Sequence, residues 1–206
     1  MAEFIRIYEE NPNPAAIENV VAILKRGGLI IYPTDSVYGL GCDITNIKAL
    51  ERIAKIKQVK LEKANFSFVC HDLSNLSDYV KQIDTSTFKI LKRALPGAYT
   101  FILPGAKTLP NPFKKRKTVG IRVPNNNIAL DIVRQLGNPI ISTSIHDEDE
   151  VLEYTTDPEL ILEKWGDKVD LVIDGGYGDN EPSTIIDLSG DDPVIIREGK
   201  GSLEIF

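Results

Sequence analysis

Residues 31–41 are the most informative stretch of the sequence, with hydroxyls, a carboxylate and a phenol close together; the run reads Ile-Tyr-Pro-Thr-Asp-Ser-Val-Tyr-Gly-Leu-Gly. Its hydroxyls, carboxylate and phenol can bind a small polar ligand through hydrogen bonds. Gly39 and Gly41 permit either a close approach of the backbone to another group or a positive φ. Pro33 has a fixed φ and no N–H to donate, so we expect the chain to leave a strand there.

Cations that could bind an anionic ligand follow this run at two places. The end of an expected helix and the turn after it carry Lys55, Lys57 and Lys63. These lysines could bind a phosphate, or they could simply be a solvated helix end. Thr118 and Arg122 are four residues apart on an expected strand, so both side chains point to the same face. Together they could bind one carboxylate or phosphate, the alternative being a salt bridge at the edge of a sheet.

A dense basic run, Lys114-Lys115-Arg116-Lys117, precedes Thr118 directly. Most such runs are solvated loops, but beside a phosphate site this one could hold an RNA backbone by non-specific charge. Residues 48–122 carry sixteen lysines and arginines and five acidic residues. Residues 123–206 carry five lysines and arginines and nineteen acidic residues. The asymmetry indicates either an anionic partner on one face or two halves that partly neutralise each other.

The elements that must position these residues alternate between strand and helix, which predicts an α/β fold. The last three expected strands have short connections without a helix, so part of the sheet should be antiparallel or mixed. Hydrophobic periodicity and capping residues predict helices at 14–24, 47–56, 85–94, 128–136 and 157–164. Strands are predicted at 29–32, 66–70, 99–103, 119–123, 139–143, 169–173, 184–188 and 194–197.

Composition favours an ordinary globular protein. The 206 residues suffice for one domain with a full core. The sequence has no apolar run long enough to cross a bilayer, and its first residues do not resemble a signal peptide. Cys42 and Cys70 are too few for a disulfide framework and too far apart for a metal motif. We therefore expect buried thiols and a cytoplasmic protein.

The run at 31–41 resembles the first motif of the YrdC/YciO family, Pro-Thr-(Glu/Asp)-(Ser/Thr)-x-Tyr-Gly-Leu-Gly. Six further matches follow in the family's order, and the details are most similar to the YciO branch. The matches extend from about residue 20 to the end of the sequence. They are Lys55-Ile56-Lys57 with 63–66, then 96–103, 118–124, Ser142-Thr143-Ser144, 182–187 and Arg197-Glu198-Gly199.

The resemblance implies one YrdC-like α/β domain over residues 1–206, with a twisted mixed sheet, flanking helices and a basic concave cleft. It implies an activity similar to L-threonylcarbamoyladenylate synthase, which joins threonine, bicarbonate and ATP to give threonylcarbamoyl-AMP and pyrophosphate for tRNA modification. Mg²⁺ is expected to accompany ATP. One alternative is a YciO-like protein that binds double-stranded RNA or tRNA with little or no synthase activity, and another is a homologue whose pocket is a relic.

By this resemblance no protein nucleophile and no resident metal are needed, because the carbamate of threonine is itself the nucleophile. Lys57 stands where the family has arginine, and Ile145-His146 stand where the synthases have Ala-Asn. Lysine makes a single-point phosphate contact, and imidazole lacks the paired donor and acceptor of an amide, so weaker nucleotide binding is expected. The expected threonine-binding residues are Thr34, Arg122 and Ser183. The expected nucleotide-binding residues are Lys55, Lys57, Lys63, Thr118, Ser144 and Arg197, and the expected RNA-binding residues are Lys114, Lys115, Arg116 and Lys117.

Overall fold

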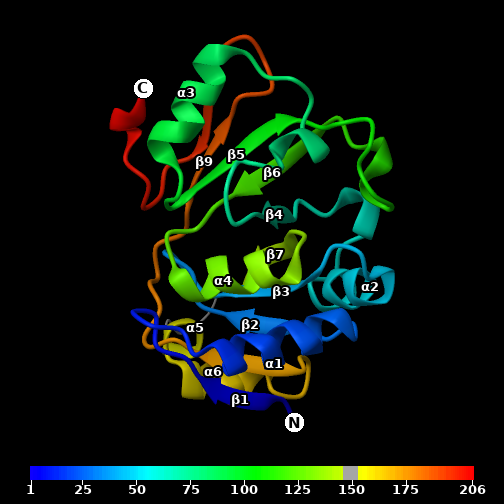
Figure 1. Ribbon diagram of the computed structural model, residues 1–206, viewed down its shortest axis with the longest axis vertical. Coiled ribbons are helices and arrows are strands. Elements are labelled where there is room, and N and C mark those ends of the chain that lie inside the picture. Colours follow the sequence, from blue (N-terminus) through cyan, green and yellow to red (C-terminus); the bar gives the residue numbers. More distant parts are fainter. Residues whose placement is uncertain (146–152) are drawn as a thin grey trace.

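The strands of the computed structural model form one mixed sheet, with β1 at the bottom of the view in Figure 1 and β9 near its top. The structure describes residues 1–145 and 153–206. Ten strands of this part pair in the order β1-β8-β2-β3-β7-β4-β6-β5-β9-β10. They are β1 (Glu3–Arg6), β2 (Ile30–Tyr32), β3 (Gly39–Asp43), β4 (Ser67–Val69), β5 (Tyr99–Pro104), β6 (Thr118–Arg122), β7 (Ile140–Ser144), β8 (Leu171–Asp174), β9 (Thr184–Asp187) and β10 (Val194–Arg197).

This sheet contains both parallel and antiparallel pairs, which confirms the mixed sheet expected from the sequence. The pairs β1–β8, β2–β8, β4–β6 and β5–β9 are parallel. The pairs β2–β3, β3–β7, β4–β7, β5–β6 and β9–β10 are antiparallel. The order places β7, β4, β6, β5, β9 and β10 side by side, although these strands come from widely separated parts of the chain.

The helices begin at caps that the sequence supplies. The Asn13 side chain accepts from the Ala15 N–H at 2.9 Å, and the Asn126 side chain accepts from the Ala129 N–H at 3.1 Å. Gly137, with φ +85°, ends the fourth helix in the left-handed conformation that glycine adopts freely. The helices are α1 (Pro14–Lys25), α2 (Ile47–Ile56), α3 (Thr85–Ala94), α4 (Asn127–Leu136), α5 (Glu153–Thr156) and α6 (Pro158–Trp165).

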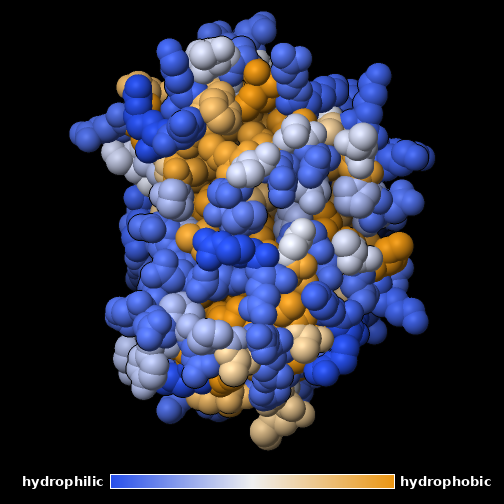
Figure 2. All heavy atoms as spheres, viewed as in Figure 1, coloured by the Kyte–Doolittle hydropathy of each residue, from blue (hydrophilic) through white to orange (hydrophobic). Residues whose placement is uncertain are grey.

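Two apolar cores lie on opposite faces of the sheet, because alternate strand residues point to opposite sides. Ile30 and Tyr32 pack with residues of α1 and α4 in one core. Ile31 belongs to the other core, which also contains residues of α2, α3 and α6. Hydrophilic residues cover most of the face shown in Figure 2, with hydrophobic residues visible between them. In the described part of the chain no helix is long and apolar enough to cross a membrane.

The predicted helices and strands are confirmed to within two residues at each end. Strands β1 and β3, helix α5 and the short 3₁₀ helices of the described residues were missed. The chain leaves the sheet at Pro33 as expected and returns as β3, which pairs with β2. Neither Gly39 nor Gly41 has a positive φ. A Cβ at Gly39 would lie 3.0 Å from the Ser142 Oγ, so this glycine permits close approach of neighbouring groups instead.

Cys42 and Cys70 are both free and buried, as expected. Burial raises the pKa of the Cys70 thiol to about 12, and it raises the pKa of Cys42 as well. Both thiols therefore stay protonated at neutral pH and are poor nucleophiles.

Candidate functional site

A cavity of about 350 Å³ opens over the strands at the middle of the sheet, and we call it the inner cavity. Its wall is rich in hydroxyl groups and contains three arginines, and none of its described lining residues is acidic. Seven neighbouring strands contribute to it because the sheet order brings β3, β7, β4, β6, β5, β9 and β10 together. The lining residues are 36–39, 65–67, Thr100, Ile102, Arg116, Thr118, Gly120, Arg122, 142–144, Pro182, Ser183, Ile185, Ile196 and Arg197.

Arg122 is the most specifically held of the three cations. Its Nη2 donates to the Asp35 Oδ1 at 3.0 Å and to the Ser36 Oγ at 3.1 Å. The ion pair is largely buried, with 11% of the Arg122 side chain and 10% of the Asp35 side chain exposed. The Arg122 Nε is buried and has no partner among the described residues. Both bonds come from Nη2, so the Nη1 donors of the guanidinium remain for a ligand.

Arg197 and Arg116 lie in the same wall and bond mainly to backbone carbonyls. The Arg197 Nη2 donates to the Ser183 carbonyl at 2.7 Å. Burial lowers the pKa of Arg197, and the nearby Arg122 charge lowers it further. Arg116 donates to the Ala64 carbonyl, and burial lowers its pKa too. Cations that are desolvated and lack a carboxylate on the same wall favour an anionic ligand, which would compensate their charge.

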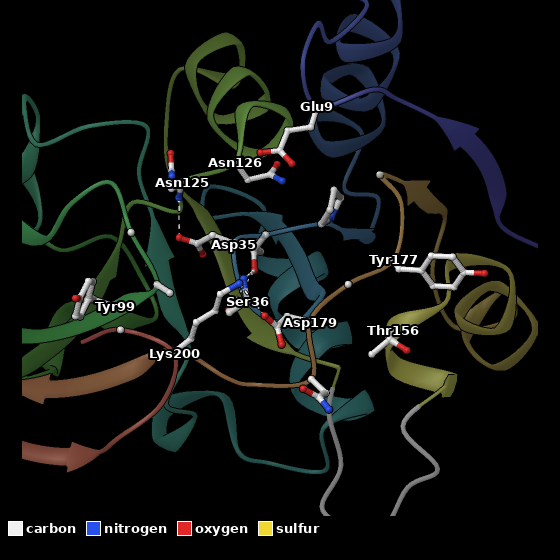
Figure 3. A pocket seen from close by; sticks show the side chains of 18 of the residues that line it. Glu9, Asp35, Ser36, Tyr99, Asn125, Asn126, Thr156, Tyr177, Asp179 and Lys200 are labelled. Atoms are coloured by element: carbon white, nitrogen blue, oxygen red, sulfur yellow. Dashed lines mark hydrogen bonds and ion pairs between the residues drawn. The ribbon is translucent and has the colours of Figure 1, made fainter. Parts of the chain in front are cut away.

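A second cavity, of about 840 Å³, lies beside the first, and we call it the outer cavity (Figure 3). Its described wall carries the acids Glu9, Asp35 and Asp179 and a single lysine, Lys200. The Lys200 Nζ reaches the Asp179 Oδ2 at 2.7 Å, with 42% and 33% of the two side chains exposed. The hydrogen bond from Lys200 lowers the pKa of Asp179. The outer cavity is therefore acidic where the inner cavity is basic.

The two cavities meet at the loop between β2 and β3. Pro33, Thr34 and Asp35 line the outer cavity, residues 37–39 line the inner cavity, and Ser36 lines both. In Figure 3, Asp35 lies between Asn125 and Ser36, and its Oδ2 accepts from the Asn125 N–H at 2.8 Å. The motif at 31–41 thus forms the partition between two sites of opposite charge.

The structure brings together five of the nine residues expected to bind threonine or nucleotide. All five line the inner cavity, and they are Thr118, Arg122, Ser144, Ser183 and Arg197. Thr34 lines the outer cavity, and its hydroxyl donates to the Val37 carbonyl at 2.8 Å, so it shapes the loop. Lys57 lies next to the inner cavity, with its Nζ 3.4 Å from the Ser144 carbonyl. Lys55 and Lys63 are exposed and line neither cavity.

The basic run is divided between the surface and the cavity wall. Lys114, Lys115 and Lys117 are exposed, whereas Arg116 is half-buried and lines the inner cavity. Arg116 donates to a backbone carbonyl, and Arg122 is paired with Asp35. His146 lies outside the described residues.

Sequence reasoning assigned no role to Asp35 or Tyr38, although both belong to the motif that drew attention. The Tyr38 hydroxyl donates to the Gly176 carbonyl at 2.7 Å and accepts from the Gly175 N–H at 3.1 Å. It ties the loop to the turn after β8, where Gly176 has φ +92°. The Gly-Gly pair was the available signal for this turn, but no feature of the sequence links it to Tyr38.

Comparison with known proteins points to one family. The family model Sua5_yciO_yrdC, described as "Telomere recombination", matches residues 22–199. The uncharacterized protein YciO of Escherichia coli (strain K12) is 44% identical over 209 residues, which cover 100% of both proteins. The threonylcarbamoyl-AMP synthase of Pseudoalteromonas translucida is 32% identical over 181 residues, covering 84% of this chain and 93% of that protein.

Solved structures agree with the fold. The crystal structure of E. coli YciO superposes with a TM-score of 0.90 at 44% identity, covering 100% of both chains. The crystal structure of P. abyssi Sua5 complexed with L-threonine superposes with a TM-score of 0.87 at 27% identity. That match covers 98% of this chain and 58% of the Sua5 chain. The expected α/β fold with flanking helices is confirmed by both comparisons.

Proposed function

The chain belongs to the Sua5/YciO/YrdC family, and we propose that its inner cavity binds threonine and ATP and forms threonylcarbamoyl-AMP. The observation that carries this proposal is the charge of the cavity: three arginines, many hydroxyls and no acid among the described lining residues. Threonine carbamate, ATP, threonylcarbamoyl-AMP and pyrophosphate are all anionic. A desolvated cationic wall stabilises such groups more strongly than water-exposed lysines do.

The residue roles follow from the geometry and from the family chemistry. Arg122 and Ser183 would hold the amino acid, and Thr34 would act through the loop that it shapes. Thr118, Ser144 and Arg197 would hold the nucleotide, with Lys57 at the edge of the cavity. These assignments put Arg197 and Lys57 at the phosphates and leave Lys55 and Lys63 without an argued contact.

The reaction joins three substrates in two steps. The threonine amine and bicarbonate give a carbamate and release water, and a carbamate oxygen then attacks the α-phosphorus of ATP as pyrophosphate leaves. Mg²⁺ bound to the triphosphate would shield its charge. The protein's own contribution is to orient the carbamate toward the phosphorus and to exclude water from this unstable group. A tRNA-modifying role of this kind would place the protein in the cytoplasm.

RNA binding is a second candidate, and the exposure of Lys114, Lys115 and Lys117 favours it. Three exposed lysines within four residues can follow a phosphate backbone without reading its sequence. Binding of this kind should weaken steeply as salt rises, because condensed counterions are released. The two functions are separable, since these lysines are outside the inner cavity.

The test is pyrophosphate release from ATP in the presence of threonine and bicarbonate. We expect release that needs all three substrates, and incorporation of ¹³C from labelled bicarbonate into the product. Lys114→Ala, Lys115→Ala and Lys117→Ala together should leave this rate unchanged but reduce tRNA affinity. If the protein binds neither threonine nor ATP and still binds tRNA with a steep salt dependence, the synthase proposal is wrong and the RNA proposal stands.

A further inference from the structure

The Asp35–Arg122 ion pair lies on the boundary between the two cavities. Arg122 lines the inner cavity and Asp35 lines the outer one, with the Arg122 Nη2 3.0 Å from the Asp35 Oδ1. The pair joins residues that are 87 positions apart in the chain. The ion pair therefore lies between the basic wall of the inner cavity and the acidic wall of the outer cavity.

A free α-amino acid brings two charges into a site, and both need a partner when they leave water. The carboxylate of threonine has three arginines available in the inner cavity. Its ammonium group has no carboxylate there among the described lining residues. The carboxylate nearest to Arg122 in the described structure is that of Asp35, which is bonded to it directly.

The dimensions of an amino acid match this pair. Its amine nitrogen and carboxylate carbon are separated by a single α-carbon, or about 2.5 Å. Both bonds that Arg122 donates to Asp35 and Ser36 come from its Nη2. A carboxylate bound to the Nη1 of Arg122 would therefore bring the ammonium within reach of Asp35. Each Asp35 oxygen accepts one hydrogen bond, from Arg122 and from the Asn125 N–H. A carboxylate oxygen has a further lone pair for another donor.

We propose that Asp35 and Arg122 form a recognition pair for the zwitterion of an α-amino acid, in which Arg122 binds the carboxylate and Asp35 binds the ammonium. This inference rests on the proposed binding of threonine and assigns Asp35 as the residue that selects an amino acid over a hydroxy acid.

A purely positioning role for Asp35 makes a different prediction. If Asp35 only holds the Arg122 guanidinium in place, removing its charge should weaken every ligand that uses Arg122 by the same factor. If Asp35 binds the ammonium, the loss should fall on ligands that carry an amine. The comparison of threonine with 3-hydroxybutyrate, which is threonine without its amine, separates the two roles.

The experiment measures the Kd of both ligands by calorimetry for the full chain and for Asp35→Asn. We expect Asp35→Asn to weaken threonine about ten- to a hundredfold, the loss of one charge-assisted hydrogen bond. We expect the Kd of 3-hydroxybutyrate to change by less than about threefold, because Asn keeps one acceptor oxygen for the Arg122 guanidinium, although its NH₂ group cannot accept from the Asn125 N–H. Equal losses for the two ligands, or no loss for either, overturn the proposal.

Ser36→Ala is the matched control, because the Ser36 Oγ accepts from the same Arg122 Nη2 at 3.1 Å but carries no charge. It should weaken threonine and 3-hydroxybutyrate by the same factor. If Asp35→Asn does not fold, Asp35→Glu takes its place. This variant moves the carboxylate, so it should change the Kd of threonine more than the Kd of 3-hydroxybutyrate. Equal changes in the two Kd values overturn the proposal. If the unaltered chain binds no threonine, the proposed function fails first and this inference fails with it, whereas threonine binding that is indifferent to Asp35 overturns the inference alone.

Discussion

The inner and outer cavities share one loop, yet they differ in both charge and exposure. The ion pair at the inner cavity has side chains that are 11% and 10% exposed, whereas the pair in the outer cavity has side chains that are 42% and 33% exposed. Water screens the second pair but not the first. The two pairs have similar lengths, 3.0 Å and 2.7 Å, so burial and not distance should decide which one matters for stability and binding.

The largest expected effect is at the buried pair. Arg122→Met leaves Asp35 as an uncompensated carboxylate that is still largely desolvated, which should reduce the free energy of unfolding by about 3 kcal/mol. Urea denaturation followed by circular dichroism measures this change. The double variant Arg122→Met/Asp35→Asn is the control, because it removes both charges, and it should be more stable than Arg122→Met alone. If the single variant is no less stable than the double, the pair is not desolvated as its burial indicates.

The next effect concerns the close packing behind the inner cavity. A Cβ added at Gly41 would lie 2.6 Å from the Ile140 Cγ2 and 3.0 Å from the Tyr32 ring, all in the interior. Gly41→Ala should therefore cost about 2 kcal/mol through overpacking, measured by urea denaturation. Gly190→Ala is the matched control, since Gly190 is exposed and no atom lies within 4 Å of its added Cβ. Equal stabilities of the two variants would show that β3 can move away from its neighbours.

These two sites also show what the sequence could and could not predict. The strands and helices follow from local periodicity, so most were predicted to within two residues. Strand β3 was missed because its Gly-Leu-Gly start is a weak strand signal; its glycines are there to admit neighbouring side chains. The pairing of Asp35 with Arg122 depends on sheet order, which periodicity does not encode. The family resemblance supplied five lining residues of the inner cavity, but not their partner across the boundary.

The lysines also show that a sequence motif does not fix where a side chain lies in the folded protein. Lys55 and Lys63 were expected at the phosphates because of their position in a motif, yet they are exposed and line neither cavity. A helix end fixes where a backbone lies but leaves a long lysine side chain free to follow solvent. The arginines were easier to interpret where they lie on strands, because the alternation of side chains fixes their face: Thr118 and Arg122 do share the inner cavity.

A smaller effect is expected at the bond that joins the two cavity walls. Tyr38→Phe removes the hydroxyl that donates to the Gly176 carbonyl at 2.7 Å, and it should cost about 1 kcal/mol. Burial raises the pKa of Tyr38 above its ordinary value of 10.0. The folded state thus favours the protonated phenol, so its contribution is complete below pH 10 and declines as pH rises above that value. The stability difference between the two proteins should be constant from about pH 6 to pH 9; a difference that falls within this range contradicts the assignment.

The smallest effect is expected at the exposed pair of the outer cavity, and it provides the sharpest contrast with Arg122. Lys200→Ala removes the partner of Asp179, but water can solvate the remaining carboxylate, so the free energy of unfolding should fall by less than about 0.5 kcal/mol. The difference should vanish in 1 M NaCl, where the Debye length is about 3 Å. Asp179→Asn is the control and should behave alike, because either variant breaks the same contact. The backbone bond from the Lys200 N–H to the Pro182 carbonyl, at 2.9 Å, is kept in both. If Lys200→Ala reduces the free energy of unfolding as much as Arg122→Met does, and the reduction persists in salt, then exposure does not explain the difference between the two ion pairs. The contrast between the two cavities would then depend on their ligands alone.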